Sequence, residues 1–99
     1  MERRLIDLEV ATITIDEAKE RYILTKDVRF LDVLEVMRNN PRFVLSYNQK
    51  GFERYAMIGP NLSGRYLLTA IAHVVDEEWR VVSAYWLRSR RGRRLYEGG

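Results

Sequence analysis

The spacing of apolar residues changes once along this chain, at Arg42, and that change restricts its possible folds more than any other feature. Before Arg42, apolar residues recur at the period of an amphipathic helix, most clearly at Phe30, Leu31, Leu34 and Met37. After it, apolar and polar residues alternate with the period of two that is typical of strands. Helices followed by a run of strands predict an α+β domain.

Turn residues divide the chain further. They predict a short N-terminal strand, two helices, a four-stranded antiparallel meander and a basic C-terminal helix. Asp27 can cap the second helix, and the Asn40–Pro41 step ends it, because proline disfavours helical backbone at the preceding residue. The predicted ranges are 11–15 for the first strand, 16–24 for the first helix, 42–47, 52–58, 65–75 and 79–86 for the meander, and 87–96 for the last helix.

Three arginines, Arg54, Arg65 and Arg80, fall on successive strands of the predicted meander. Regular alternation would place Arg80 on the face of its strand that also carries Trp86, with Tyr85 on the opposite face. Whether the three arginines share a face depends on strand register, which the sequence does not fix.

The composition excludes several classes of protein. A chain of 99 residues is expected to form one domain, residues 1–99. The absence of cysteine excludes disulfides, thiol nucleophiles and cysteine-ligated metals, and a single histidine makes any metal site implausible. The longest uncharged run, residues 66–75, is about half the ~20 residues of a membrane helix, and residues 1–7 lack the apolar stretch of a secretory signal. We therefore expect a cytoplasmic protein that contacts no membrane and needs neither cofactor nor metal.

The charge distribution is consistent with a phosphate-rich partner, and a thermostable or high-GC composition, in which arginine replaces lysine, would account for part of it. The net charge is +3, fourteen of the seventeen cations are arginine, and the whole excess lies in residues 51–99. Arginine binds phosphate through a planar fork of donors, and arginines on a sheet can stabilise the charge of a phosphodiester transition state. RNA supplies its own nucleophile, the 2′-hydroxyl, so its cleavage needs no metal.

Two further features are consistent with RNA binding. The rings of Tyr85 and Trp86 can stack on unpaired bases. The run at residues 88–94 has the charge of a nucleic-acid contact, although a solvated terminal helix or a contact with an acidic partner chain would look the same. Its five arginines are Arg88, Arg90, Arg91, Arg93 and Arg94.

Most of the chain, from about residue 14 to residue 98, resembles the BrnT-type toxins of bacterial type II toxin–antitoxin modules, which have a RelE-like ribonuclease fold. The resemblance rests on short segments in the family's order. They are residues 15–19 (Ile-Asp-Glu-Ala-Lys), a helix pair closed at residues 30–41, residues 54–59 (Arg-Tyr-Ala-Met-Ile-Gly), residues 64–67 (Gly-Arg-Tyr-Leu), residues 80–84 (Arg-Val-Val-Ser-Ala) and residues 94–97 (Arg-Leu-Tyr-Glu).

The resemblance implies an endoribonuclease that cleaves messenger RNA and inhibits translation, with a cognate antitoxin protein as its partner in a heteromer. We expect the catalytic residues to be Lys26, Arg54, Arg65, Arg80 and Tyr85, and the RNA-binding residues to be Trp86 and the five arginines of residues 88–94.

Two departures from the family pattern favour an alternative. The family usually has Lys-His-Gly between its helices, where this chain has Thr25, Lys26 and Asp27. It also has an Arg-Lys pair where this chain has Tyr85 and Trp86. Both changes remove basic groups, so the alternative is a non-catalytic RelE-like module that binds RNA or a protein partner.

Overall fold

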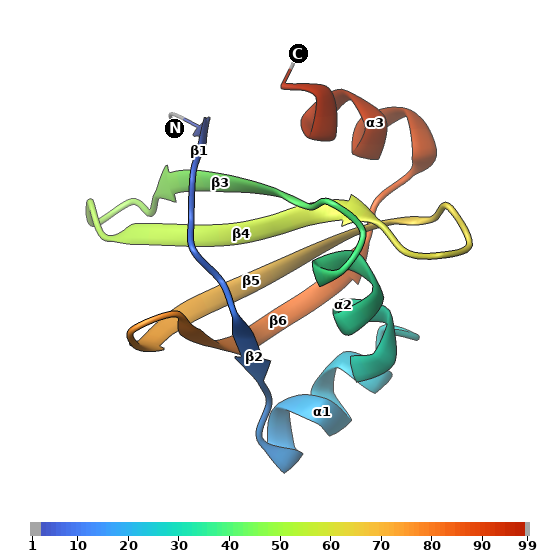
Figure 1. The fold of residues 1–99 in the computed structure, drawn as a ribbon, viewed down its shortest axis with the longest axis horizontal. Helices are drawn as coiled ribbons and strands as arrows, with labels where there is room; N and C mark the ends of the chain where they lie inside the picture. Colours follow the sequence, from blue (N-terminus) through green and yellow to red (C-terminus); the bar gives the residue numbers. More distant parts are fainter. Residues whose placement is uncertain (1–2, 99) are drawn as a thin grey trace.

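The computed structural model describes residues 3–98, which form one six-stranded sheet and three helices (Figure 1). The strands are β1 (Arg3–Ile6), β2 (Thr12–Thr14), β3 (Arg42–Tyr47), β4 (Glu53–Pro60), β5 (Tyr66–Val75) and β6 (Glu78–Trp86), and the helices are α1 (Glu17–Leu24), α2 (Phe30–Met37) and α3 (Ser89–Glu97).

The strand order across the sheet is β1-β3-β4-β5-β6-β2. Strands β3 to β6 form the predicted antiparallel meander, and β2 adds to one edge parallel to β6. Strand β1 adds to the other edge, antiparallel to β3. The α+β class is therefore confirmed, whereas the predicted number of strands is wrong because β1 was not expected.

Strand β1 has no strand pattern of its own. Its sequence, Arg-Arg-Leu-Ile, does not alternate, and its regular backbone comes from pairing with β3, where Leu5 lies opposite Val44. Residues 7–11 then connect the two edges of the sheet (Figure 1), and the indole Nε1 of Trp79 donates a hydrogen bond to the carbonyl of Glu9 at 3.2 Å.

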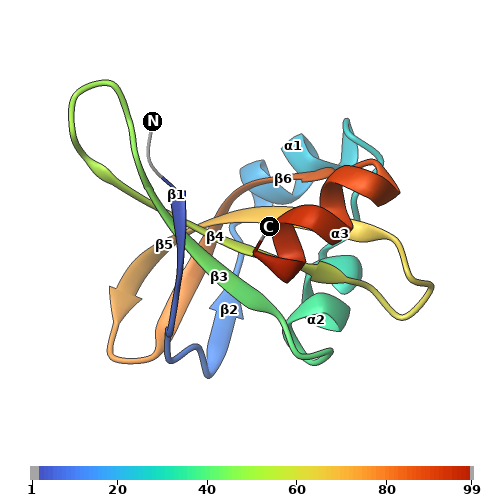
Figure 2. The same ribbon diagram turned by 90° about the horizontal axis from the view of Figure 1, so that it is seen from above.

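Helices cover both faces of the sheet (Figures 1 and 2). On the α1/α2 face, side chains of α1 and α2 pack on the strands in the larger core cluster. On the α3 face, Leu95 and Tyr96 of α3 pack in the smaller one. The buried members of the first cluster are Ile13, Ile23, Val28, Val33, Val36, Met57, Leu67, Val81 and Ala84, and those of the second are Val44, Ile58 and Leu87.

Side-chain caps fix the starts of the first two helices. Asp16 precedes α1 and accepts a hydrogen bond from the backbone N–H of Lys19 at 2.7 Å. The prediction that Asp27 caps α2 is wrong. Asp27 lies in the turn after α1 with a left-handed φ of 62°, and Arg29 is the N-cap residue, whose N–H donates to the carboxylate of Asp32 at 2.9 Å. Within residues 3–98, no helix combines the length and apolar character that a membrane span requires.

A β-bulge in β6 overturns the predicted alternation of its second half. Ile71 pairs with Val81 but Ala70 pairs with Ser83, so Val82 is an extra residue on β6. After the bulge the faces exchange. Ala84 and Trp86 lie on the α1/α2 face, and Tyr85 lies on the α3 face with Arg80.

Candidate nucleic-acid interface

Three arginines form a row across the α3 face of the sheet, which we call the arginine row: Arg3, Arg54 and Arg80. Arg3 pairs with Ser46, and Ser46 pairs with Arg54 on its other side. On β6, Arg80 pairs with Ala72 of β5. Since neighbouring strands lie about 4.8 Å apart, Arg3 and Arg54 stand roughly 10 Å apart on either side of Ser46. The pairing of β4 with β5 begins at Tyr55, one residue after Arg54, and all three arginines are exposed.

A groove of about 530 Å³ lies beside this row. Its floor is apolar and contains the facing alanines Ala56 and Ala70, while Arg3 and Arg54 contribute charge at its rim. The groove has the size of a small-ligand site, and it combines a flat apolar floor with guanidinium groups. Such a surface can hold a planar base while the arginines bind phosphate.

Lys26 lies beside Tyr85, and Tyr85 lines the β6 side of the groove. The ring of Tyr85 lines the groove, and the Lys26 ammonium lies 5.8 Å from the centre of that ring and 4.9 Å from that of Tyr22. Both rings attract the ammonium cation. Two predicted site residues that are distant in sequence are therefore close together.

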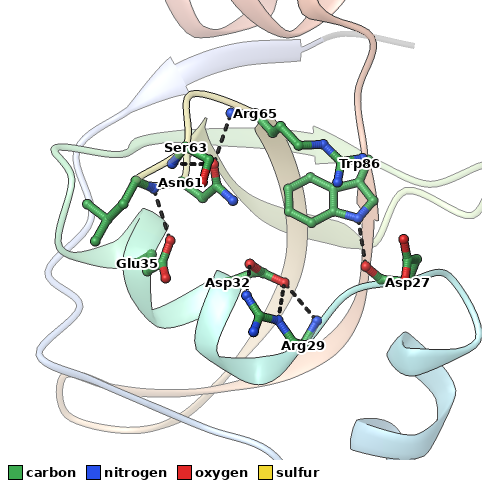
Figure 3. Close-up of polar contacts among 9 residues, drawn as sticks. Asp27, Arg29, Asp32, Glu35, Asn61, Ser63, Arg65 and Trp86 are labelled. Carbon is green, nitrogen blue, oxygen red and sulfur yellow. Dashed lines mark hydrogen bonds and ion pairs between the residues drawn. The ribbon is translucent and has the colours of Figure 1, made fainter.

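Arg65 is separated from the other predicted arginines. It precedes β5 on the side of the strand that carries Leu67, so it lies on the α1/α2 face, and its guanidinium carbon stands 4.0 Å from the centre of the Trp86 indole ring (Figure 3). The question that the sequence left open is therefore answered: Arg65 does not share a face with Arg54 and Arg80, because the register and the alternation of β5 place it on the other side.

A polar network holds Arg65 in this place (Figure 3). The amide oxygen of Asn61, a buried residue, accepts hydrogen bonds from the N–H groups of Ser63 and Arg65 at 3.0 and 2.9 Å. The carboxylate of Glu35 accepts one from the N–H of Leu62 at 3.0 Å. The turn between β4 and β5 is therefore fixed to α2.

Asp32 is the buried charge beneath this turn, and it is 3% exposed. Burial opposes its ionisation, but hydrogen bonds from the backbone and the guanidinium of Arg29 outweigh burial and hold the pKa of the carboxyl below its ordinary value. Asn61 acts in the same direction. The same ion pair raises the pKa of Arg29.

The arginines of α3 do not point into the sheet groove. Arg90, Arg93 and Arg94 line a second hollow of about 590 Å³ with Tyr66. Arg88 is the N-cap residue of α3 and Arg91 is exposed, and neither lines either hollow. The predicted RNA-binding residues of α3 thus form a basic surface of their own.

Arg3 is the member of the arginine row that sequence reasoning missed. No strand was predicted for its segment, and only the pairing of β1 with β3 brings it opposite Ser46. Within residues 3–98, no three histidine, aspartate or glutamate side chains gather closely enough to hold a metal ion. His73 is exposed near the end of β5, with its Nε2 atom 2.7 Å from the carbonyl of Asp76.

Comparison of the chain with protein-family models, with curated proteins and with solved structures finds no match.

Proposed function

We propose that this protein is the toxin of a type II toxin–antitoxin module and that it binds and cleaves single-stranded messenger RNA on the α3 face of its sheet. The observation that carries the proposal is an apolar groove lined by Arg3, Arg54 and Tyr85, with Lys26 beside the ring of Tyr85. In this reading the protein works in the cytoplasm, where messenger RNA is translated.

The proposed reaction uses the RNA's own hydroxyl group. The 2′-oxygen attacks the adjacent phosphorus as its proton passes to water, the bond from phosphorus to the 5′-oxygen breaks, and a 2′,3′-cyclic phosphate forms. Arg54 and Arg80 bind the phosphate and stabilise the extra negative charge of the transition state. Lys26, beside the ring of Tyr85, gives a proton to the leaving 5′-oxygen, and Tyr85 offers its ring to a base.

The proposed partner is an antitoxin with an acidic binding segment. The apolar floor of the groove and the arginines at its rim match a chain that alternates apolar and acidic residues. Such a segment would cover the arginine row and exclude RNA.

The position of Arg65 favours a second candidate function, a non-catalytic RNA-binding module. Arg65, one of the expected catalytic residues, lies on the α1/α2 face and does not line the groove. The chain also has no histidine between α1 and α2.

Induced expression tests the proposal, with growth and total RNA integrity as readouts. The wild type should arrest growth and degrade RNA, and the Arg54→Ala/Arg80→Ala variant should do neither. Arg21→Ala/Arg38→Ala removes the same charge from exposed positions on α1 and at the end of α2, and it should behave as wild type.

Purified protein separates the two candidate functions. Cleavage of single-stranded RNA in the presence of a chelator, with 2′,3′-cyclic phosphate ends, supports the toxin. Tight binding that leaves RNA intact supports the non-catalytic module. Growth and RNA that are unaffected, together with no RNA binding in vitro, would contradict both.

A further inference from the structure

We propose that Arg65 and Trp86 form a guanine-recognition site for single-stranded RNA on the α1/α2 face, separate from the arginine row. The inference rests on the proposed function in one respect, that the ligand is RNA. It adds a base preference and names the side chains that produce it.

The guanidinium group of Arg65 lies over the indole ring of Trp86. The guanidinium carbon of Arg65 lies 4.0 Å from the centre of the indole ring, and the side chain is exposed. No carboxylate within residues 3–98 forms an ion pair with it. One flat side of the group is occupied by the indole, so its N–H donors remain available along the edge (Figure 3).

The Trp86 indole and the backbone of Arg65 are held in place before a ligand arrives. The indole Nε1 of Trp86 donates a hydrogen bond of 2.9 Å to the carbonyl of Asp27, a residue whose left-handed backbone turns the chain between α1 and α2. Asn61 holds the backbone of Arg65, as described above. Binding therefore costs little ordering of these side chains.

Charged groups of both signs surround Arg65 and Trp86. The segments that hold Arg65 and Trp86 carry two carboxylates, Glu35 beside the turn and Asp27 beside the indole (Figure 3). Asp32 is already paired with Arg29. Lys26 and Arg29 stand on the same segment as Asp27, so the acidic and basic groups around the pair balance, and the site suits an uncharged ligand edge with two acceptors.

Guanine offers that edge. Its O6 and N7 atoms accept two parallel hydrogen bonds from one guanidinium, which is the commonest specific contact between arginine and a base. A base in the plane of the guanidinium also extends over the ring system beneath it, so stacking and hydrogen bonding favour the same pose.

The test compares two labelled ten-residue oligonucleotides, one of uridines only and one with a single central guanosine, by fluorescence anisotropy at one salt concentration. The wild-type protein should bind the guanosine oligonucleotide about tenfold more tightly. Arg65→Ala and Arg65→Lys should both reduce this preference to near one, since lysine keeps the charge but lacks the planar fork. Arg38→Ala, which removes an exposed arginine at the end of α2, should keep it.

A change in the RNA removes any dependence on folding of the variants. Replacing guanosine with 7-deazaguanosine deletes the N7 acceptor, and the wild-type protein should then lose most of its preference. Equal affinity of the wild type for the two oligonucleotides would overturn the inference. So would a uniform loss of affinity in Arg65→Ala that lysine restores, because that result identifies a phosphate contact. Failure of the wild type to bind either oligonucleotide would contradict the proposed function itself.

Discussion

At the scale of single residues, Asp32 is the clearest case of a charge stabilised by its surroundings. Its carboxylate is almost fully buried, and it accepts hydrogen bonds from the N–H and the guanidinium of Arg29. A buried carboxylate without such partners would be strongly destabilising. The bonds lower the pKa of Asp32, so the ionised form stabilises the folded protein.

Asp32→Asn should lower the free energy of unfolding by about 1–3 kcal/mol at pH 7, because it replaces charge-assisted hydrogen bonds with weaker ones. The pKa of Asp32 is lower in the folded than in the unfolded chain, so its contribution is complete above a pH of about 4 and is lost as the pH falls through the folded value. Urea denaturation at pH 6 and at pH 2.5 measures the difference between wild type and variant. A difference that stays constant between these pH values would show that the carboxylate is not stabilised in this way.

At the scale of elements, α3 reaches the sheet only because Gly92 faces it. A Cβ atom at this position would lie 2.3 Å from the Cβ atom of Tyr66, well inside van der Waals contact. Leu95 and Tyr96 follow on the same side and pack in the smaller core cluster. The spacing of these residues, rather than the arginines of α3, fixes its position above β4 and β5.

Gly92→Ala should therefore destabilise the protein although alanine favours helices more than glycine does. The strain of moving α3 away from Tyr66 should reduce the free energy of unfolding by about 1–3 kcal/mol. Arg91→Ala, at the exposed neighbouring position, is the matched control and should change stability little. Thermal unfolding distinguishes them, and a Gly92→Ala variant as stable as wild type would mean that α3 does not pack this closely.

Comparison of the predicted and observed helices and strands shows which elements the sequence could predict and which it could not. Periodicity and turn residues located both N-terminal helices and all four strands of the meander, and the arginine-rich segment before the terminal glycines indicated α3. Periodicity failed for β1, whose strand conformation depends on a partner distant in sequence, and for the second half of β6, where Val82 interrupts the alternation. Both failures concern pairing between strands, which no local pattern encodes.

The same two errors in strand pairing affected the prediction of the candidate site. The sequence placed Arg54 and Arg80 on two strands of the meander, but their common face and the presence of Arg3 in place of Arg65 required the full register. The meeting of Lys26 with Tyr85 required the bulge, which brings Tyr85 to the α3 face. Residue types were thus predictable from the sequence, and their grouping was not.

At the scale of the whole molecule, the basic residues occupy separate surfaces with different surroundings. The arginine row borders an apolar groove on the α3 face, the arginines of α3 line a second hollow, and Arg65 lies on the opposite face of the sheet beside carboxylates. A net charge of only +3 can therefore still produce a strongly basic local surface. The central claim is that RNA phosphates bind at the arginine row.

The most direct test of this claim is the salt dependence of single-stranded RNA binding. Each phosphate contact contributes roughly 0.7 to the slope of log affinity against log salt concentration, so Arg54→Ala/Arg80→Ala should lower the slope by about 1.4 and weaken binding at low salt. The charge-matched variant Arg21→Ala/Arg38→Ala should keep the wild-type slope. If both variants change the slope equally, RNA responds only to net charge, and the arginine row is not its binding site.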